Sequence, residues 1–82
     1  MKKQIGRDGV AVTGPEEWPF LQGRDGHLVP IPPDHMVMEG QDGRIVPVPL
    51  GYMVMEGPDG RVVAVPPGRL AYPNRKGRIE IL

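Results

Sequence analysis

The fold of this 82-residue chain is decided by the stretch PVPLGYMVMEGPDGRVVAVPPGRLAY, residues 47–72. It holds two short apolar segments, YMVM and VVAV, and each is enclosed by Pro or Gly. Successive residues of a β-strand point to opposite faces of a sheet. Apolar side chains are therefore expected on both faces, although one face of so small a protein would ordinarily meet water.

The stretch belongs to a 17-residue repeat that runs through the chain. From Gly6 the sequence divides into GRDGVAVTGPEEWPFLQ (6–22), GRDGHLVPIPPDHMVME (23–39), GQDGRIVPVPLGYMVME (40–56), GPDGRVVAVPPGRLAYP (57–73) and the half block NRKGRIEIL (74–82). Self-similarity at a fixed period indicates a repeat architecture, in which each unit buries its apolar surface against its neighbours. We therefore divide the chain into an N-terminal arm, residues 1–5, and a single repeat domain, residues 6–82.

Each block predicts two turns. The G-x-D-G segment is typical of a type I turn with a G1 bulge, whose last glycine has a positive φ. The second connection, PPGR at 66–69 or PLGY at 49–52, favours a type II turn, and Asp34 takes the glycine place in the second block. The predicted residues of the first kind of turn are Asp25, Gly26, Asp42, Gly43, Asp59 and Gly60.

Short strands are expected between the turns. Segments such as 52–56 and 61–65 have the usual length of a strand. A helix is excluded because Pro or Gly recurs every few residues, and Pro alone costs about 3 kcal/mol in a helix interior. Pro30 and Pro47 lie inside strands and cannot donate a ladder hydrogen bond, so at those points the strand must be an edge or face a gap. The sequence predicts an all-β, elongated repeat fold without a broad sheet.

Exposed strand edges that carry apolar side chains would aggregate unless something covered them. A small chain also buries only a modest fraction of its surface. We therefore expect another copy of the same chain to provide the cover.

The repeat resembles that of the triple β-spiral, the fold of the adenovirus fibre shaft, the reovirus attachment protein and some phage spikes. The resemblance is carried by the spacing in GYMVMEGPDGRVVAVPP: a Gly-led strand of alternating large apolar residues, a turn, and a second strand with Val63 and Val65 two apart. It covers essentially residues 6–82. The chain differs from that pattern by having Pro and Gly at both connections and Pro within strands. A different trimeric β-prism or a single-chain solenoid therefore stays open.

The resemblance implies three parallel chains wrapped about one axis. The apolar residues of both strands would then face the axis and the neighbouring chain. The expected inter-chain core consists of Val29, Ile31, Val46, Val48, Met53, Val54, Met55, Val63 and Val65.

The two ends of the repeat are irregular. The first block holds the only Trp and the only Phe, and its aromatic segment predicts a docking surface for another protein through Trp18, Phe20 and Leu21. The alternative is a terminal cap, because the end units of repeat arrays are atypical. The half block ends in alternating apolar residues and is expected to close the last layer or to lead into a following head.

Composition argues against several functions. Ten basic residues balance ten acidic ones and are scattered, so nucleic acid is not an expected partner. No apolar run approaches the length of a membrane span, and no apolar segment of a signal peptide follows the N-terminal MKK, so we expect neither a membrane partner nor export by that route. The absence of Cys fits a reducing compartment.

No catalytic, cofactor-binding or metal-binding residue is predicted. One Asp recurs per block, but turn formation accounts for it, and the further acidic ligands of a calcium loop are missing. A ring of one His per chain on a trimer axis could bind a metal ion, whereas His27 is expected to be a solvated surface residue. Glu39 and Glu56 are expected to pair with Arg44 and Arg61 across the hairpin, which contributes about 0–1 kcal/mol.

The leading hypothesis is a non-enzymatic structural component of a phage or viral virion, assembled in the host cytoplasm. It would be a short homotrimeric fibre or spike, or a capsid-decorating protein, that contacts a capsid or tail protein. This virion assignment rests on the resemblance alone. The alternative is a monomeric β-hairpin repeat module that binds glycan or cell wall. An engineered repeat is a third possibility, and the divergence of the first and last blocks argues against it.

Overall fold

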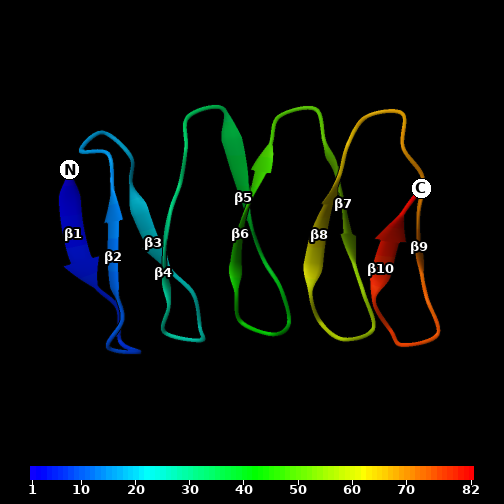
Figure 1. Ribbon diagram of the computed structural model, residues 1–82, viewed down its shortest axis with the longest axis horizontal. Helices are drawn as coiled ribbons and strands as arrows, with labels where there is room; N and C mark the ends of the chain where they lie inside the picture. Colours follow the sequence, from blue (N-terminus) through cyan, green and yellow to red (C-terminus); the bar gives the residue numbers. More distant parts are fainter.

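The computed structural model describes residues 1–82 and forms five antiparallel hairpins in a row (Figure 1). Hairpins 1 to 5 follow one another in sequence, and the two termini lie at opposite ends of the row. Their strands are β1 (Lys2–Ile5) with β2 (Ala11–Gly14), β3 (Phe20–Gln22) with β4 (Leu28–Pro30), β5 (His35–Glu39) with β6 (Ile45–Pro49), β7 (Met53–Glu56) with β8 (Val62–Val65), and β9 (Ala71–Pro73) with β10 (Ile79–Ile81).

The all-β prediction is confirmed, and the chain contains no helix. Each sheet has only two strands, so every strand is an edge, which is one of the two arrangements expected for Pro30 and Pro47. Residues 1–5, set apart above as an arm, include β1, which pairs with β2 from Lys2 opposite Gly14 to Ile5 opposite Ala11. The half block supplies β10 and thereby completes a fifth hairpin.

The G-x-D-G segments close the hairpins as type I turns with a bulge. In the fourth hairpin the Gly60 amide donates to the Gly57 carbonyl at 3.0 Å, and Gly60 has a φ of 84°. Pro58 suits the second turn position because its φ is preset. The Asp59 carboxylate accepts the Arg61 amide at 3.1 Å, which secures the bulge.

The connections between hairpins are a second kind of turn. The Tyr52 amide donates to the Pro49 carbonyl at 3.2 Å, and Gly51 has a φ of 89°, as a type II turn requires. Asp34, which occupies the equivalent place in the second block, has a φ of 59°. Both turn predictions are therefore confirmed.

The strand register gives each hairpin two distinct faces. In hairpin 3, Met36 is opposite Val48 and Met38 is opposite Val46 on one face, here called the forward face. The rear face carries the intervening residues, among them Ile45. The same division applies to the other hairpins at a spacing of 17 residues.

The rear face of each hairpin packs on the forward face of the hairpin before it. The Phe20 ring of hairpin 2 lies beside Gly14 of hairpin 1. Further along, a rear-face side chain lies beside the first loop glycine of the previous hairpin in three successive pairs: Ile45 with Gly23, Val62 with Gly40, and Ile79 with Gly57. Consecutive hairpins of one chain thus cover apolar residues on both faces, which explains much of the pattern in residues 47–72.

The loops of hairpins 1 to 4 are joined in succession by backbone hydrogen bonds. An Asp amide donates to the carbonyl of the last loop glycine of the next hairpin at 3.1–3.2 Å, in the pairs Asp8 with Gly26, Asp25 with Gly43, and Asp42 with Gly60. This carbonyl approaches the first glycine of the preceding loop so closely that a Cβ on Gly40 would lie 2.7 Å from the Gly60 oxygen. The first loop position therefore excludes a side chain.

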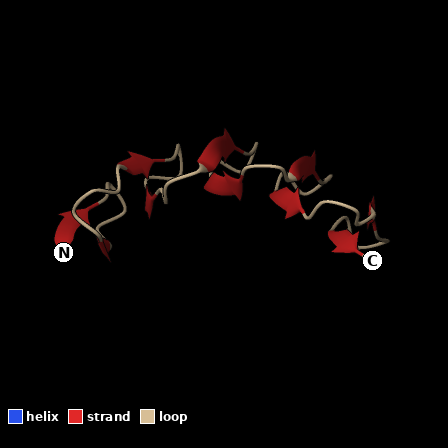
Figure 2. Ribbon diagram, turned by 90° about the horizontal axis from the view of Figure 1, so that it is seen from above, coloured by secondary structure: helices blue, strands red, loops and turns tan.

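The row is thin and arched (Figure 2). It measures 38 × 25 × 14 Å, and its radius of gyration of 14.0 Å exceeds the roughly 12 Å of a compact chain of this length. Twelve residues are buried, and the only large apolar side chains among them are those of Leu28, Ile31, Val48 and Val65. The other eight are glycines, so the interior consists largely of backbone in close contact.

Replacing Gly40 with Ala is expected to destabilise the protein by about 1–3 kcal/mol, because the new Cβ overlaps the Gly60 carbonyl and forces the loops apart. Urea unfolding monitored by circular dichroism measures the effect. The control is Gln41→Ala at the exposed neighbouring position, which should change stability by less than about 0.5 kcal/mol. Equal unfolding midpoints for the two variants would contradict the close approach.

Candidate functional site

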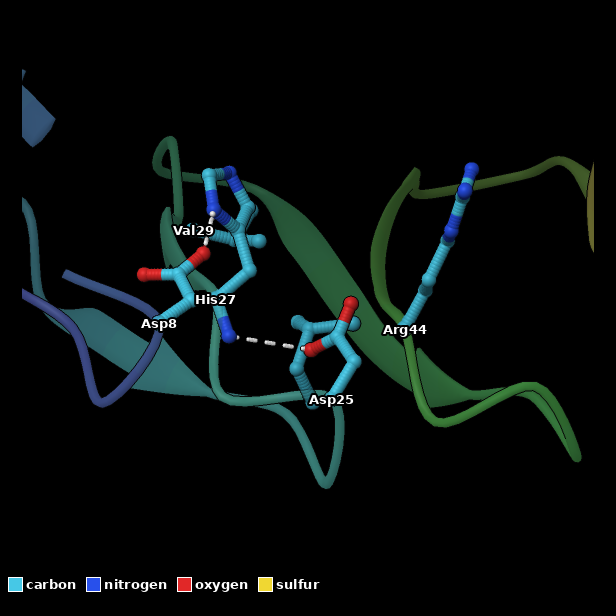
Figure 3. A pocket seen from close by; sticks show the side chains of 6 residues that line it. Asp8, Asp25, His27, Val29 and Arg44 are labelled. Carbon is cyan, nitrogen blue, oxygen red and sulfur yellow. Dashed lines mark hydrogen bonds and ion pairs between the residues drawn. The ribbon is translucent and has the colours of Figure 1, made fainter. Parts of the chain in front are cut away.

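The largest depression of the molecule, about 390 Å³, lies where the loops of the first three hairpins meet. It is lined by Asp8, Asp25, His27, Val29, Arg44 and Ile45. Figure 3 shows the His27 ring turned toward the Asp8 carboxylate, whereas Arg44 stands apart on the following loop. The loop turns position all four polar side chains, because each lies within or directly after a G-x-D-G segment.

His27 and Asp8 form a contact between two hairpins. The His27 Nδ1 atom lies 2.9 Å from Asp8 Oδ2, and the His27 backbone amide donates to Asp25 Oδ1 at 3.0 Å (Figure 3). The pKa of Asp8 is lowered below its ordinary value of 3.8, first by the hydrogen bond from the Val10 amide and then by His27. The expected surface position of His27 is correct, since about 45% of its side chain is exposed, but the ring also joins two repeat units.

A smaller depression of about 130 Å³ recurs at equivalent positions between hairpins 4 and 5. It is lined by Asp59, Arg61, Val63, Arg78 and Ile79, which match residues 25, 27, 29, 44 and 45 at a spacing of two repeats. The depression is thus a seam that the stacking of hairpins produces repeatedly. The Asp25 and Asp59 carboxylates accept hydrogen bonds from backbone amides of their own loops, so both carboxylates have a structural role.

The predicted ion pairs across the hairpins are wrong. Arg44 and Arg61 instead lie 3.8 Å from the Asp of their own loop, Asp42 and Asp59 respectively. Glu39 reaches back to the preceding loop, where it contacts the Arg24 side chain at 3.5 Å and accepts the Arg24 amide at 3.0 Å. These acidic and basic side chains therefore reinforce the row of loops. No group of three or more His, Asp or Glu side chains is arranged to hold a metal ion.

The residues expected in an inter-chain core fall into three groups. Ile31, Val48 and Val65 are already buried between the hairpins of one chain, with exposures of 6%, 0% and 5%, so they have no surface left for a second chain. At the other extreme, 71% of Met53 is exposed. The remaining members are half-buried: Val29, Val46, Val54, Met55 and Val63.

The three residues expected to dock another protein lie in different surroundings. Phe20 is engaged within the chain, between Gly14 and the Lys2 ammonium, whose Nζ lies 4.7 Å from the ring centre. Trp18 is half-buried and lines a depression of about 310 Å³ that Ile31 and His35 also line. Leu21 is exposed on β3. The structure therefore does not gather them into one docking surface.

An apolar surface along the first strands of the hairpins was missed in part by sequence reasoning. We call it the first-strand edge, and in hairpins 2 to 5 it consists of the exposed residues Leu21, Met36, Val37, Met38, Met53, Leu70 and Tyr72, of which Leu70 directly precedes β9. In hairpins 2 to 4 no large apolar residue of a second strand is equally exposed. The available signal was the repeat itself, because residues 36–38 match residues 53–55 at a spacing of 17.

The comparisons with known proteins give no match: no family model, no curated protein and no solved structure is similar to this chain. The structure has no helix of the length and apolarity needed to cross a membrane.

Replacing His27 with Ala is expected to raise the pKa of Asp8, although the pKa stays below 3.8 because the Val10 amide still donates to the carboxylate. A carboxyl whose pKa is depressed by folding stabilises the protein above its unfolded pKa, and this contribution is lost as the pH falls through the folded pKa. The variant should therefore show a smaller stability loss over that acid range. NMR titration of the Asp8 carboxyl carbon measures the shift.

The matched control is His35→Ala. His35 Nδ1 contacts the Pro33 carbonyl at 2.8 Å and has no carboxylate partner, so its removal should leave the Asp8 titration unchanged. An Asp8 pKa that does not move in His27→Ala would contradict the contact between the two hairpins.

Proposed function

We propose that this chain is a non-enzymatic assembly module whose copies associate side by side through the first-strand edge. The observation that carries the proposal is an asymmetry of exposure. In hairpins 2 to 4 the apolar residues of the second strands are buried or half-buried, whereas the first strands keep large apolar side chains exposed to water. Met53 and Leu70 are each 71% exposed. Apolar surface that gathers along one side of a protein marks an interaction site.

The backbone supports the same proposal. The chain makes 35 backbone hydrogen bonds, whereas a compact domain of this length forms roughly 55–60. Every sheet ends after two strands, so the outer edge of each first strand offers amide and carbonyl groups to a further strand. Association of copies along this edge would satisfy such groups and cover the apolar side chains together.

More specifically, we propose that three copies form a homotrimer. It would serve in a virion as a short fibre, a spike or a capsid-decorating protein, in contact with a capsid or tail protein. The number of chains and the virion setting are supported only by the resemblance of the repeat GYMVMEGPDGRVVAVPP to the triple β-spiral. The role is mechanical: stacked repeats extend a rod, and three linked copies present any attached binding surface with higher avidity.

A single-chain module that binds glycan or cell wall is the second candidate. It is favoured by the intrachain stacking, because hairpins that cover one another need less help from a second chain. Trp18 and His35, which occupy equivalent repeat positions, also share one depression, and an aromatic ring there offers a stacking surface for a sugar.

Analytical ultracentrifugation of the purified chain tests the proposal. We expect a trimer of about three times the 9.0 kDa chain mass, and we expect Met53→Asp to weaken association at least tenfold, about 1.4 kcal/mol, because a charge would be buried in the contact. Leu50→Asp is the matched control, since Leu50 is 60% exposed but lies in a connecting turn. A compact monomer for the unmodified chain would overturn the proposal and favour the single-chain module.

A further inference from the structure

The forward face of hairpin 5 differs from every other forward face in the row. Glu80 takes the position that is held by valine in the earlier units, at Val29, Val46 and Val63. Its neighbour Ile79 points toward hairpin 4, where it lies beside Gly57. Because adjacent strand residues alternate, Glu80 faces away from the row, where a further hairpin would otherwise stack.

Glu80 is held there by a polar network. The Tyr72 hydroxyl donates to Glu80 Oε2 at 2.6 Å, and the Asn74 side-chain amide donates to Glu80 Oε1 at 3.0 Å. These two bonds lower the pKa of Glu80 below its ordinary value, and the carboxylate in turn raises the pKa of Tyr72. The forward face therefore presents a carboxylate at the position where the other units present valine. Leu70 and Leu82 lie on the same face and are 71% and 62% exposed. Burying the carboxylate under a second copy would be unfavourable.

The loop of hairpin 5 lacks both residues, the first glycine and the Asp, whose equivalents join the loops of hairpins 1 to 4. Asn74 stands in place of the first loop glycine, so its side chain occupies the space into which the carbonyl of a following loop would enter. Lys76 stands in place of Asp, and its amide donates to Asn74 Oδ1 at 2.9 Å. The equivalent amides of Asp8, Asp25 and Asp42 donate to the next loop instead. The donor that would continue the ladder is thus used within the loop.

The opposite end of the row is also altered. The rear face of hairpin 1 carries Ala11 where later hairpins have a larger apolar residue, namely Leu28, Ile45, Val62 and Ile79. Thr13 and Lys3 occupy the neighbouring rear-face positions. Ile5, which pairs with Ala11, is exposed on the same face.

From these observations we infer that hairpin 5 is a cap that prevents copies from stacking head to tail, so that copies can meet only along the sides of the row. In repeat proteins, polar groups on the outer face of a terminal unit oppose further stacking. The cap stands on the stacking geometry alone, and only the lateral contact rests on the proposed function. The inference therefore holds whether the chain is a trimer or a monomer.

The test removes the cap in a chain that carries Met53→Asp, so that lateral association does not obscure the result. Asn74→Gly, Lys76→Asp and Glu80→Val restore the internal pattern of the forward end, and Ala11→Ile restores the rear face. We expect the average mass in sedimentation velocity to rise at least twofold as concentration increases, while Met53→Asp alone keeps a constant mass. The control is the same chain with Ala11→Asp in place of Ala11→Ile. Its average mass should not change with concentration.

A correctly folded uncapped chain whose mass stays constant would overturn the inference, as would head-to-tail polymers of the unmodified chain. Circular dichroism checks the fold. If the full set of changes prevents folding, Asn74→Gly with Lys76→Asp alone still frees the loop ladder, and an absence of growth in that variant overturns the inference equally. Failure of the lateral proposal would be seen separately, as a monomeric unmodified chain.

Discussion

The structure depends on one close approach, that of a glycine carbonyl to the first glycine of the loop before it. At Gly40 there is room for a hydrogen atom but not for a methyl group, because the Gly60 oxygen would lie 2.7 Å from a Cβ. This contact brings the Asp42 amide within 3.2 Å of the same oxygen, and the equivalent bonds join the loops of hairpins 1 to 4. The first four hairpins are thereby placed against one another at one edge, and the packing of their faces follows.

The stacking also explains how a chain with so few large buried side chains keeps a defined shape. A hairpin of two short strands is only marginally stable by itself. Here each hairpin inside the row packs one face on the hairpin before it and the other face on the hairpin after it. Val48 is fully buried although it belongs to a sheet of only two strands. In hairpins 2 to 4 the stacking leaves the apolar residues of the second strands buried or half-buried, whereas the first strands keep apolar side chains exposed to water. These exposed side chains form the first-strand edge, through which we propose that copies associate.

Sequence reasoning succeeded where the physics is local. The positions of Pro58, Gly60 and Gly51 predicted both turn types, because each depends on the φ that one residue can adopt. It failed for Glu39, whose partner proved to be Arg24 of the preceding loop and not Arg44. The pairing depends on how loops lie side by side, and spacing within one block does not contain that information. The overlooked signal was the first loop glycine: Gly40 does not adopt a positive φ, so its conservation through the blocks required another explanation.

By itself, the sequence determined the repeat, the all-β class, the turns and the approximate strands, because proline, glycine and the alternation of apolar residues restrict the backbone over a few residues. It could not decide what covers the two apolar faces in residues 47–72. A neighbouring hairpin of the same chain and a hairpin of another chain require the same apolar pattern. Only the tertiary structure decided that consecutive hairpins of one chain supply much of this cover, since the close contact between loops acts across 17 or more residues. The apolar surface that remains uncovered is that of the first strands.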